Sequence, residues 1–254
     1  MADMSVARIE HFTSFDGVDL AYGRMGQGRA VILLHGLFSN HHMNWVKFGH
    51  ADHLAGLGFE VILPDLRAHG QSSAPQEARF YPQDVLARDL AALIAHLRLV
   101  DFDLAGFSLG ARTVAQALLL GLRPRRAALT GMGLEGLTHA SRRQQFFLEA
   151  IAHEGQVKMG SPYWFAVQFM RTMKVDMVAA AHVVRTLTDV QAAALSDIDL
   201  PIAVICGDKD QDNGSAPALA ALLPQGRYME ITGDHVTSVS GAGLGLALGD
   251  FFTA

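Results

Sequence analysis

Short runs of apolar, largely branched residues alternate along this chain with longer segments of helical periodicity, and this alternation constrains the fold more than any other feature. The runs lack the alternating polar positions of a half-exposed strand, as is expected where both faces of a parallel sheet are covered. They are AVILLH (30–35), FEVILP (59–64), DFDLAG (101–106), AALTGM (127–132), PIAVICG (201–207) and RYMEIT (227–232). The sequence therefore predicts an α/β fold with a mostly parallel, doubly covered sheet.

The segments between these runs predict helices, and the N-terminal region predicts a hairpin. PQDVLARDLAALIAHLRL (82–99) has Pro82 near its start and leucines at three- and four-residue spacing, as in an amphipathic helix. ARIEHFTS (7–14) and VDLAYGRM (18–25) flank a turn that contains Asp16 and Gly17. We expect them to form an antiparallel N-terminal hairpin.

The strand–helix alternation is interrupted once, between Gly133 and about Asp197, where only helical stretches are found. An insertion of this size is long enough to cover a site. We therefore expect a core domain formed by residues 1–132 and 198–254, and a helical cap formed by residues 133–197.

Charge and apolar runs disfavour several classes of partner. The 254-residue chain has a net charge of −5, which favours neither nucleic acid nor an anionic membrane surface as a partner. No apolar run approaches the length of a membrane span, and MADMSVARIE (1–10) lacks the basic and apolar regions of a secretory signal. The lone Cys206 lies in an apolar run, where a buried thiol is a small core residue. We expect a soluble, cytoplasmic protein, and the sequence leaves its oligomeric state open.

The stretch LAGFSLGART (104–113) places Ser108 where a predicted strand turns into a predicted helix. A tight turn of this kind brings neighbouring backbone very close, so a Cβ at Gly106 or Gly110 would collide. The turn would hold the Ser108 hydroxyl clear of the backbone, at the positive end of a helix. Ser108 is therefore a candidate nucleophile.

A serine hydroxyl becomes a good nucleophile only when a base takes its proton and a carboxylate orients that base. His235 lies in the loop after the last predicted strand. The preceding strand ends at Gly207 and is followed by three carboxylates, Asp208, Asp210 and Asp212. Any of these three carboxylates could orient the histidine.

A negative charge that develops on an attacked carbonyl oxygen is best stabilised by two backbone N–H groups. One is expected from Leu109, the residue after the nucleophile. The other is expected from Leu37 in VILLHGLF (31–38), where Gly36 frees the backbone after a strand.

Together these motifs resemble the α/β-hydrolase fold family, in its serine-nucleophile branch of esterases and lipases. The resemblance runs almost from end to end through ordered motifs: VILLHGLF, Trp45 in the following helix, DLRAHGQS (65–72), AGFSLG, LPIAVICGDKD and ITGDH. It implies that Ser108 is the nucleophile, His235 the base and Asp210, the third residue after Gly207, the acid. Asp208 and Asp212 are then expected to be solvated loop residues or caps. Glu135, at the position where some relatives carry the acid, is the alternative to Asp210.

Three features depart from the family pattern. Ala68 stands where DLRGHG has a glycine, and Ala111 follows the elbow where glycine is common. The histidine loop lacks the Glu-Pro pair that is often found a few residues later. His35 and His69 match family positions near the oxyanion loop, and we expect structural hydrogen bonds from them, as we expect a structural ion pair from Arg67.

With serine at position 108, the resemblance disfavours members that use an aspartate nucleophile, which are the haloalkane dehalogenases and most epoxide hydrolases. The predicted reaction is hydrolysis of a carboxylic ester through an acyl-serine, with no cofactor. No metal site is predicted: the clustered His41, His42, His50 and His53 lack Cys or carboxylate ligands at suitable spacing, and we interpret them as a polar helix face.

The predicted cap is rich in aromatic residues and methionine. Those that line an acyl pocket would make it apolar and adaptable. We therefore predict that the substrate is a small-molecule ester with a small to medium apolar acyl group. The same triad would also serve other reactions, which differ in the shape of the pocket that they need: lactone or thioester hydrolysis, cleavage of a carbon–carbon bond in a diketone, or cofactor-free perhydrolysis. A slow-turnover small-molecule receptor of the same fold is the alternative from another class.

Overall fold

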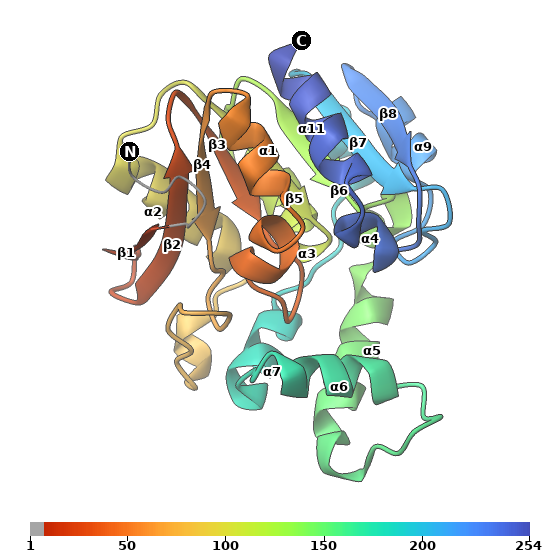
Figure 1. The fold of residues 1–254 in the computed structure, drawn as a ribbon. Coiled ribbons are helices and arrows are strands. Elements are labelled where there is room, and N and C mark those ends of the chain that lie inside the picture. Colours follow the sequence, from red (N-terminus) through yellow and green to blue (C-terminus); the bar gives the residue numbers. More distant parts are fainter. Residues whose placement is uncertain (1–7) are drawn as a thin grey trace.

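An eight-stranded sheet organises the molecule, and the computed structural model describes residues 8–254 (Figure 1). The strands are β1 (Arg8–Thr13), β2 (Asp19–Gly26), β3 (Arg29–Leu34), β4 (Phe59–Pro64), β5 (Phe102–Phe107), β6 (Ala127–Thr130), β7 (Ile202–Gly207) and β8 (Gly226–Ile231). They lie in the order β1-β2-β4-β3-β5-β6-β7-β8. Residues 1–7, which include most of the stretch tested for a secretory signal and the first residue of the predicted hairpin, lie outside the described part.

The sheet is parallel except at its N-terminal edge. β1 pairs with β2 and β2 pairs with β4 in antiparallel register, whereas the pairs from β4 through β3, β5, β6 and β7 to β8 are parallel. The predicted fold class, with its antiparallel hairpin, is confirmed. β6 ends at Thr130, earlier than predicted, because the chain turns at Gly131 with φ +57°, a conformation that glycine adopts without strain.

Helices cover both faces of the sheet. Ile32 and Leu33 are neighbours in β3 but pack into different apolar clusters, because side chains alternate across a strand. One face is covered by α2 (Val85–Leu97), α3 (Leu109–Leu119) and α9 (Ala216–Leu222), and the other by α1 (His50–Gly56) and α11 (Gly243–Thr253). Trp45 is fully buried in a short π-helix, η1 (His42–Val46). Within residues 8–254, no helix combines the length and the apolar character that a membrane crossing requires.

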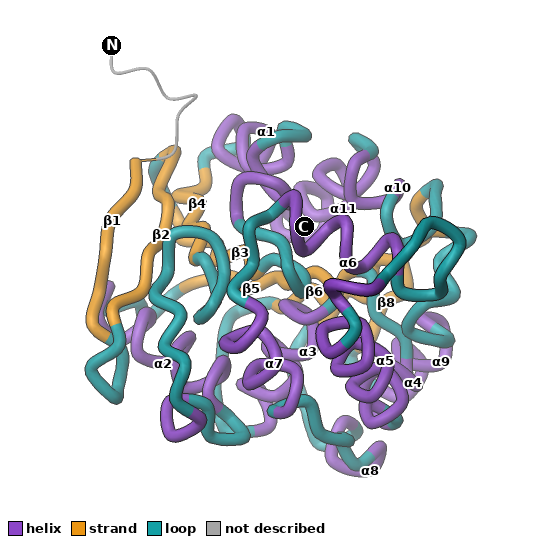
Figure 2. Tube along the Cα trace, turned by 90° about the horizontal axis from the view of Figure 1, so that it is seen from below, coloured by secondary structure: helices purple, strands orange, loops and turns teal. Residues whose placement is uncertain are grey.

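A helical segment separates β6 from β7, as predicted. It contains α4 (Leu134–Thr138), α5 (Ala140–Ala152), η3 (Glu154–Gln156), α6 (Trp164–Thr172), α7 (Met177–Arg185) and α8 (Ala192–Leu195). Figure 1 shows α5, α6 and α7 below the sheet, at the edge where the parallel strands end, and the view from below shows them in front of the central strands (Figure 2). The division into a core domain (1–132 and 198–254) and a cap (133–197) stays a prediction.

A buried arginine ties the N-terminal hairpin to α2. The Arg67 side chain is 0% exposed, and its guanidinium donates to the carboxylates of Asp16 and Asp89 at 2.6–3.0 Å. A third contact, at 2.6 Å, goes to the carbonyl oxygen of Phe80 at the end of η2 (Ala78–Phe80). Burial alone would lower the pKa of Arg67, but the two paired carboxylates raise it above its ordinary value. Arg67 is the structural ion-pair residue that the sequence predicts.

We expect Arg67→Met to reduce the free energy of unfolding by about 3–5 kcal/mol, because it leaves the buried Asp89 carboxylate without its counter-charge. Urea unfolding of the wild type and the variant measures the change. Arg79→Met is the matched control: the Arg79 side chain is 75% exposed and lies 4.0 Å from Glu77, so its loss should cost less than about 1 kcal/mol. Equal losses in the two variants would contradict the argument.

Candidate active site

Ser108 sits at a sharp turn between β5 and α3, with φ 53° and ψ −108°. A positive φ in a residue with a side chain costs about 1–3 kcal/mol and persists only where the surroundings enforce it. They do so here. A Cβ on Gly106 would lie 2.2 Å from the carbonyl carbon of Gly110, and one on Gly110 would lie 2.2 Å from the oxygen of Leu34. The two glycines therefore allow the close approach that the turn requires.

The structure brings together the three side chains that the sequence predicts to act as a unit. His235 Nε2 lies 3.1 Å from Ser108 Oγ, and His235 Nδ1 lies 2.8 Å from Asp210 Oδ2. The Asp210 side chain is 1% exposed and that of His235 is 14% exposed. In this arrangement Nδ1 donates to the carboxylate, which leaves the lone pair of Nε2 facing the serine hydroxyl. The geometry allows proton transfer from Ser108 to His235.

Asp210 is held ionised in a buried position. Burial alone would raise its pKa, but the hydrogen bond and the electrostatic attraction of His235 lower the pKa below the ordinary value. The second carboxylate oxygen, Oδ1, accepts the amide N–H of Asp212 at 3.1 Å. The aromatic ring of Phe107 packs against the His235 imidazole with centroids 4.9 Å apart. The imidazole is thus oriented from two sides.

Asp208 and Glu135, two other candidates for the acid that orients His235, have different hydrogen-bond partners. Asp208 is an exposed loop residue, as expected, and its Oδ1 accepts the amide of Gly233 at 2.8 Å, linking the acid loop to the histidine loop. Glu135 accepts the amide of Ser215 at 2.7 Å, whereas His235 bonds Asp210. The structure therefore groups Asp210, and not Glu135, with His235 and Ser108.

The loop after β3 is braced so that one amide stays unused. The N–H of Gly36 donates to Asn44 Oδ1 at 2.8 Å, that of Phe38 to His69 Nε2 at 3.0 Å, and that of Ser39 to the Gly36 oxygen at 3.2 Å. Among the hydrogen bonds of residues 8–254, none uses the amide of Leu37.

This loop lies against the nucleophile. A Cβ on Gly36 would be 3.6 Å from the Ser108 Cβ. The amide of Leu109, the first residue of α3, likewise has no acceptor among the described residues. Both amides are therefore free to bind an anionic oxygen near Ser108, and their role as oxyanion donors stays a prediction. Asn44 was not predicted as a support of this loop, because nothing in its local sequence pattern distinguishes it from a surface asparagine.

Two buried histidines support this loop and the one after β4. His35 Nε2 accepts the amide of Leu66 at 2.9 Å, and His69 Nδ1 donates to the Arg67 oxygen at 2.9 Å. Burial and the neighbouring His69 lower the pKa of His35 to about 3, against the opposing effect of Asp65. Burial also lowers the pKa of His69. Both rings are therefore neutral and structural at neutral pH.

The cluster of histidines near η1 is not a polar helix face throughout, so that interpretation was wrong for two members. His41 is buried and bonds Asp65 Oδ1 through its backbone and its ring, both at 2.8 Å. His50 is also buried, and its Nε2 lies 2.7 Å from the carbonyl oxygen of Val239, beyond the histidine loop. Within residues 8–254, no group of three or more histidines, cysteines or carboxylates could hold a metal ion.

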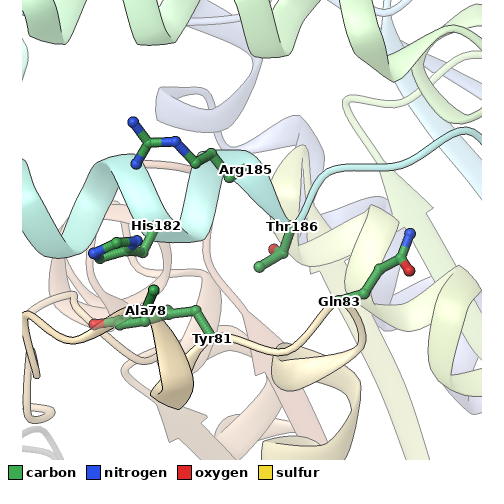
Figure 3. A pocket seen from close by; sticks show the side chains of 6 residues that line it. All are labelled: Ala78, Tyr81, Gln83, His182, Arg185 and Thr186. Carbon is green, nitrogen blue, oxygen red and sulfur yellow. The ribbon is translucent and has the colours of Figure 1, made fainter.

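A small cavity lies where α7 meets the segment before α2, and none of the triad residues lines it. Its volume is about 290 Å³ and it is lined by Ala78, Tyr81, Gln83, His182, Arg185 and Thr186 (Figure 3). The rings of Tyr81 and His182 stack with centroids 5.2 Å apart, and His182 Nε2 lies 3.0 Å from the Gln76 oxygen. These contacts seat α7 against the core.

Comparisons with known proteins agree with this fold. Residues 29–144 match the family model of the alpha/beta hydrolase fold. The AB hydrolase superfamily protein YisY of Bacillus subtilis is 42% identical over 86 residues, which are 34% of this chain and 30% of that protein. An epoxide hydrolase of Caballeronia sordidicola is 32% identical over 130 residues, 51% of this chain and 38% of that enzyme. The aligned segments thus span about a third of these curated relatives.

Solved structures match over nearly the whole chain. An esterase from Thermogutta terrifontis superposes with a TM-score of 0.76 and 21% identity, covering 97% of this chain and 98% of the esterase. At that identity the likeness shows the fold alone.

The buried, neutral His35 predicts a stability that falls in acid. In the unfolded chain this histidine takes up a proton near its ordinary pKa of 6.5, whereas in the folded chain it does so only near 3. Between these values the unfolded state binds more protons, so the free energy of unfolding should fall by up to about 1.4 kcal/mol per unit of decreasing pH from this residue. Urea unfolding between about pH 7 and about pH 5 measures this slope.

His35→Gln keeps a hydrogen-bond acceptor and removes the titrating group, so its slope should be shallower than that of the wild type. His42→Gln, at an exposed position, is the matched control and should keep the wild-type slope. An unchanged slope in His35→Gln would show that His35 does not titrate as its burial requires.

Proposed function

We propose that this chain, which matches the family model of the alpha/beta hydrolase fold over residues 29–144, is a serine hydrolase that cleaves a small to medium apolar carboxylic ester through an acyl-serine intermediate. The observation that carries the proposal is the continuous hydrogen-bonded chain from Ser108 Oγ through the His235 ring to Asp210. The strained turn that presents the serine, and the unused amides of Leu37 and Leu109 beside it, support the same reading.

Acylation begins when Ser108 Oγ attacks the carbonyl carbon of the ester and His235 Nε2 takes the hydroxyl proton. The carbonyl oxygen becomes an oxyanion, which accepts hydrogen bonds from the amides of Leu37 and Leu109. Collapse of the tetrahedral intermediate breaks the bond to the alkoxy oxygen, and this leaving group takes the proton from His235. The products of this half-reaction are an alcohol and acyl-Ser108.

Deacylation follows the same steps with water as the nucleophile. His235 takes a proton from the water as the water oxygen attacks the acyl carbon, and then returns that proton to Ser108 Oγ as the carboxylic acid leaves. Asp210 stabilises the imidazolium that forms in each half-reaction, and its hydrogen bond keeps the ring in the tautomer that accepts at Nε2.

Epoxide hydrolysis is not proposed, although several relatives are named epoxide hydrolases. The family resemblance assigns an aspartate nucleophile to most members with that activity, and the residue at the elbow here is Ser108. An acyl substrate also fits the surroundings. The nucleophile is flanked in the chain by Phe107 and Leu109, and Leu37 belongs to the loop beside it, so apolar residues lie next to the serine along with His235.

Ser108→Ala should abolish turnover of p-nitrophenyl esters while leaving the unfolding temperature within a few degrees of the wild type, because only the nucleophilic oxygen is removed. Asp210→Asn should lower kcat by about 10²–10⁴-fold, since the amide no longer favours the productive tautomer. A fluorophosphonate should label the wild type at Ser108, as peptide mapping would show.

Glu135→Gln is the matched control and should keep kcat within about threefold of the wild type, because Glu135 does not contact His235. Retained esterase activity in Ser108→Ala would refute the proposal. A single slow burst without steady turnover in the wild type would identify a receptor in place of an enzyme.

The apolar surroundings of Ser108 also predict the acyl preference. In a series of p-nitrophenyl esters, kcat/KM should be highest for acetyl to hexanoyl groups. It should be at least about tenfold lower for succinyl and other charged groups, which must lose their hydration in an apolar pocket. A charged acyl group that turned over best would contradict this prediction.

A further inference from the structure

One helix of the insertion contacts two of the loops that carry proposed catalytic groups, the loop after β3 and the loop after β7. Phe147 in α5 packs edge to face on Phe38, with ring centroids 5.3 Å apart and an interplanar angle of 85°. Arg143, one turn earlier in α5, places its guanidinium 5.4 Å from the centre of the Phe147 ring and donates from Nη1 to the Asp212 oxygen at 2.7 Å. Residues four apart lie on the same helix face, so this face spans from the loop after β3 to the loop after β7.

On the side of the β3 loop, the contact reaches the residue next to the proposed oxyanion donor. Phe38 is buried and has φ +61°, a conformation that a phenylalanine keeps only when its surroundings hold it. Its side chain belongs to the apolar cluster of the insertion, and the Leu37 side chain packs on the same cluster. The Phe38 amide is held separately by His69. Without the Phe147 ring, this strained residue would lose part of the packing that fixes it.

On the side of the β7 loop, the contact reaches the residue that orients the acid. Asp212 uses two backbone groups: its N–H donates to Asp210 Oδ1 at 3.1 Å, and its oxygen accepts from Arg143. Asp210 Oδ2 in turn accepts from His235. Arg143 therefore braces the backbone that presents one of the hydrogen bonds to the acid carboxylate.

We propose that Phe147 and Arg143 are positioning residues: the Leu37 amide and the Asp210 carboxylate hold their working geometry only while α5 is seated on both loops. The inference rests on the proposed hydrolase function and deepens it, because it makes turnover depend on how the helical insertion sits. Neither side chain touches the reacting atoms in the proposed mechanism. Their effect should therefore fall on kcat, with little change in substrate binding.

The first measurement is ester turnover in Phe147→Ala, Phe147→Leu and Arg143→Met. A displacement of about 1 Å at a reacting group can cost about 10²-fold in rate, so kcat should fall about 10–100-fold in Phe147→Ala and about tenfold in Arg143→Met, with KM within about threefold. Phe147→Leu keeps apolar contact with Phe38 and should recover most of kcat.

Two variants serve as matched controls on the same insertion. Phe165 is 81% exposed, and Phe165→Ala removes an aromatic ring that does not reach either loop. Arg142 is exposed beside Arg143, and Arg142→Met removes the same charge from a different face of α5. Both controls should keep kcat within about twofold of the wild type.

The second measurement is amide hydrogen exchange, which does not depend on a substrate. Peptides that cover residues 35–39 should exchange faster in Phe147→Ala, and those that cover residues 208–212 should exchange faster in Arg143→Met, with no change in the controls. Thermal unfolding of each variant distinguishes a local from a global effect. If Phe147→Ala does not fold, Phe147→Leu and Arg143→Met carry the test.

The two measurements separate a failure of this inference from a failure of the proposed function. A wild type that neither turns over esters nor reacts with a fluorophosphonate would refute the hydrolase, while exchange would still decide whether α5 holds the loops. An active wild type with unchanged kcat and exchange in Phe147→Ala and Arg143→Met would overturn the inference. Equal loss of kcat in the controls would overturn it as well.

Discussion

The close approach of backbone at the turn between β5 and α3 is the constraint on which the rest of the site depends. Leu34 in β3 pairs with Gly106 in β5, and the turn brings Gly110 against the end of the same β3 strand. A side chain at Gly106 would push the start of α3 away from β5, and one at Gly110 would push it away from the end of β3. Because β3 and β5 are neighbours at this point, the loop after β3 lies directly beside Ser108. The strained backbone of Ser108 and the position of the Leu37 amide therefore depend on the same packing of the turn against β3.

The fold and the reactive residues could be predicted from the sequence because their signals are local. Buried strands appear as continuous apolar runs, and a serine between two glycines at a strand–helix boundary identifies the turn. Parallel strands end at a common edge, so loops that follow different strands meet there even when they are far apart in sequence. That rule leads from Ser108 to His235 and Asp210, whose side chains the structure brings within hydrogen-bond reach. Their catalytic roles remain for experiment.

The support of the site could not be predicted, because it depends on pairs of residues that no local pattern connects. Asn44 holds one amide of the loop after β3, yet in the sequence it is an asparagine in polar surroundings. The hydrogen bonds of His69 were expected only from the family resemblance, which did not identify the Phe38 amide as a partner. A histidine in a helical segment gives the same signal whether it faces solvent or a buried carboxylate, and for that reason the burial of His41 against Asp65 was missed. The bond from the Gly233 amide to Asp208 could not be predicted either, because the two residues belong to different loops.

These supports are themselves anchored by the buried ion pair at Arg67. The backbone of the segment after β4 carries Arg67 between Leu66, whose amide donates to His35, and Ala68, which has φ +66°. Ala68 stands where the family pattern has glycine, so this chain keeps a left-handed conformation without the residue that adopts it freely, at a cost of about 1–2 kcal/mol. The guanidinium bonds to Asp16 and Asp89 hold the segment in that conformation. Since the Arg67 oxygen accepts from His69, whose ring accepts the Phe38 amide, the ion pair reaches the loop beside Ser108 through neutral groups alone. The direction of the proposed oxyanion donor therefore depends on charges that never approach the reacting atoms.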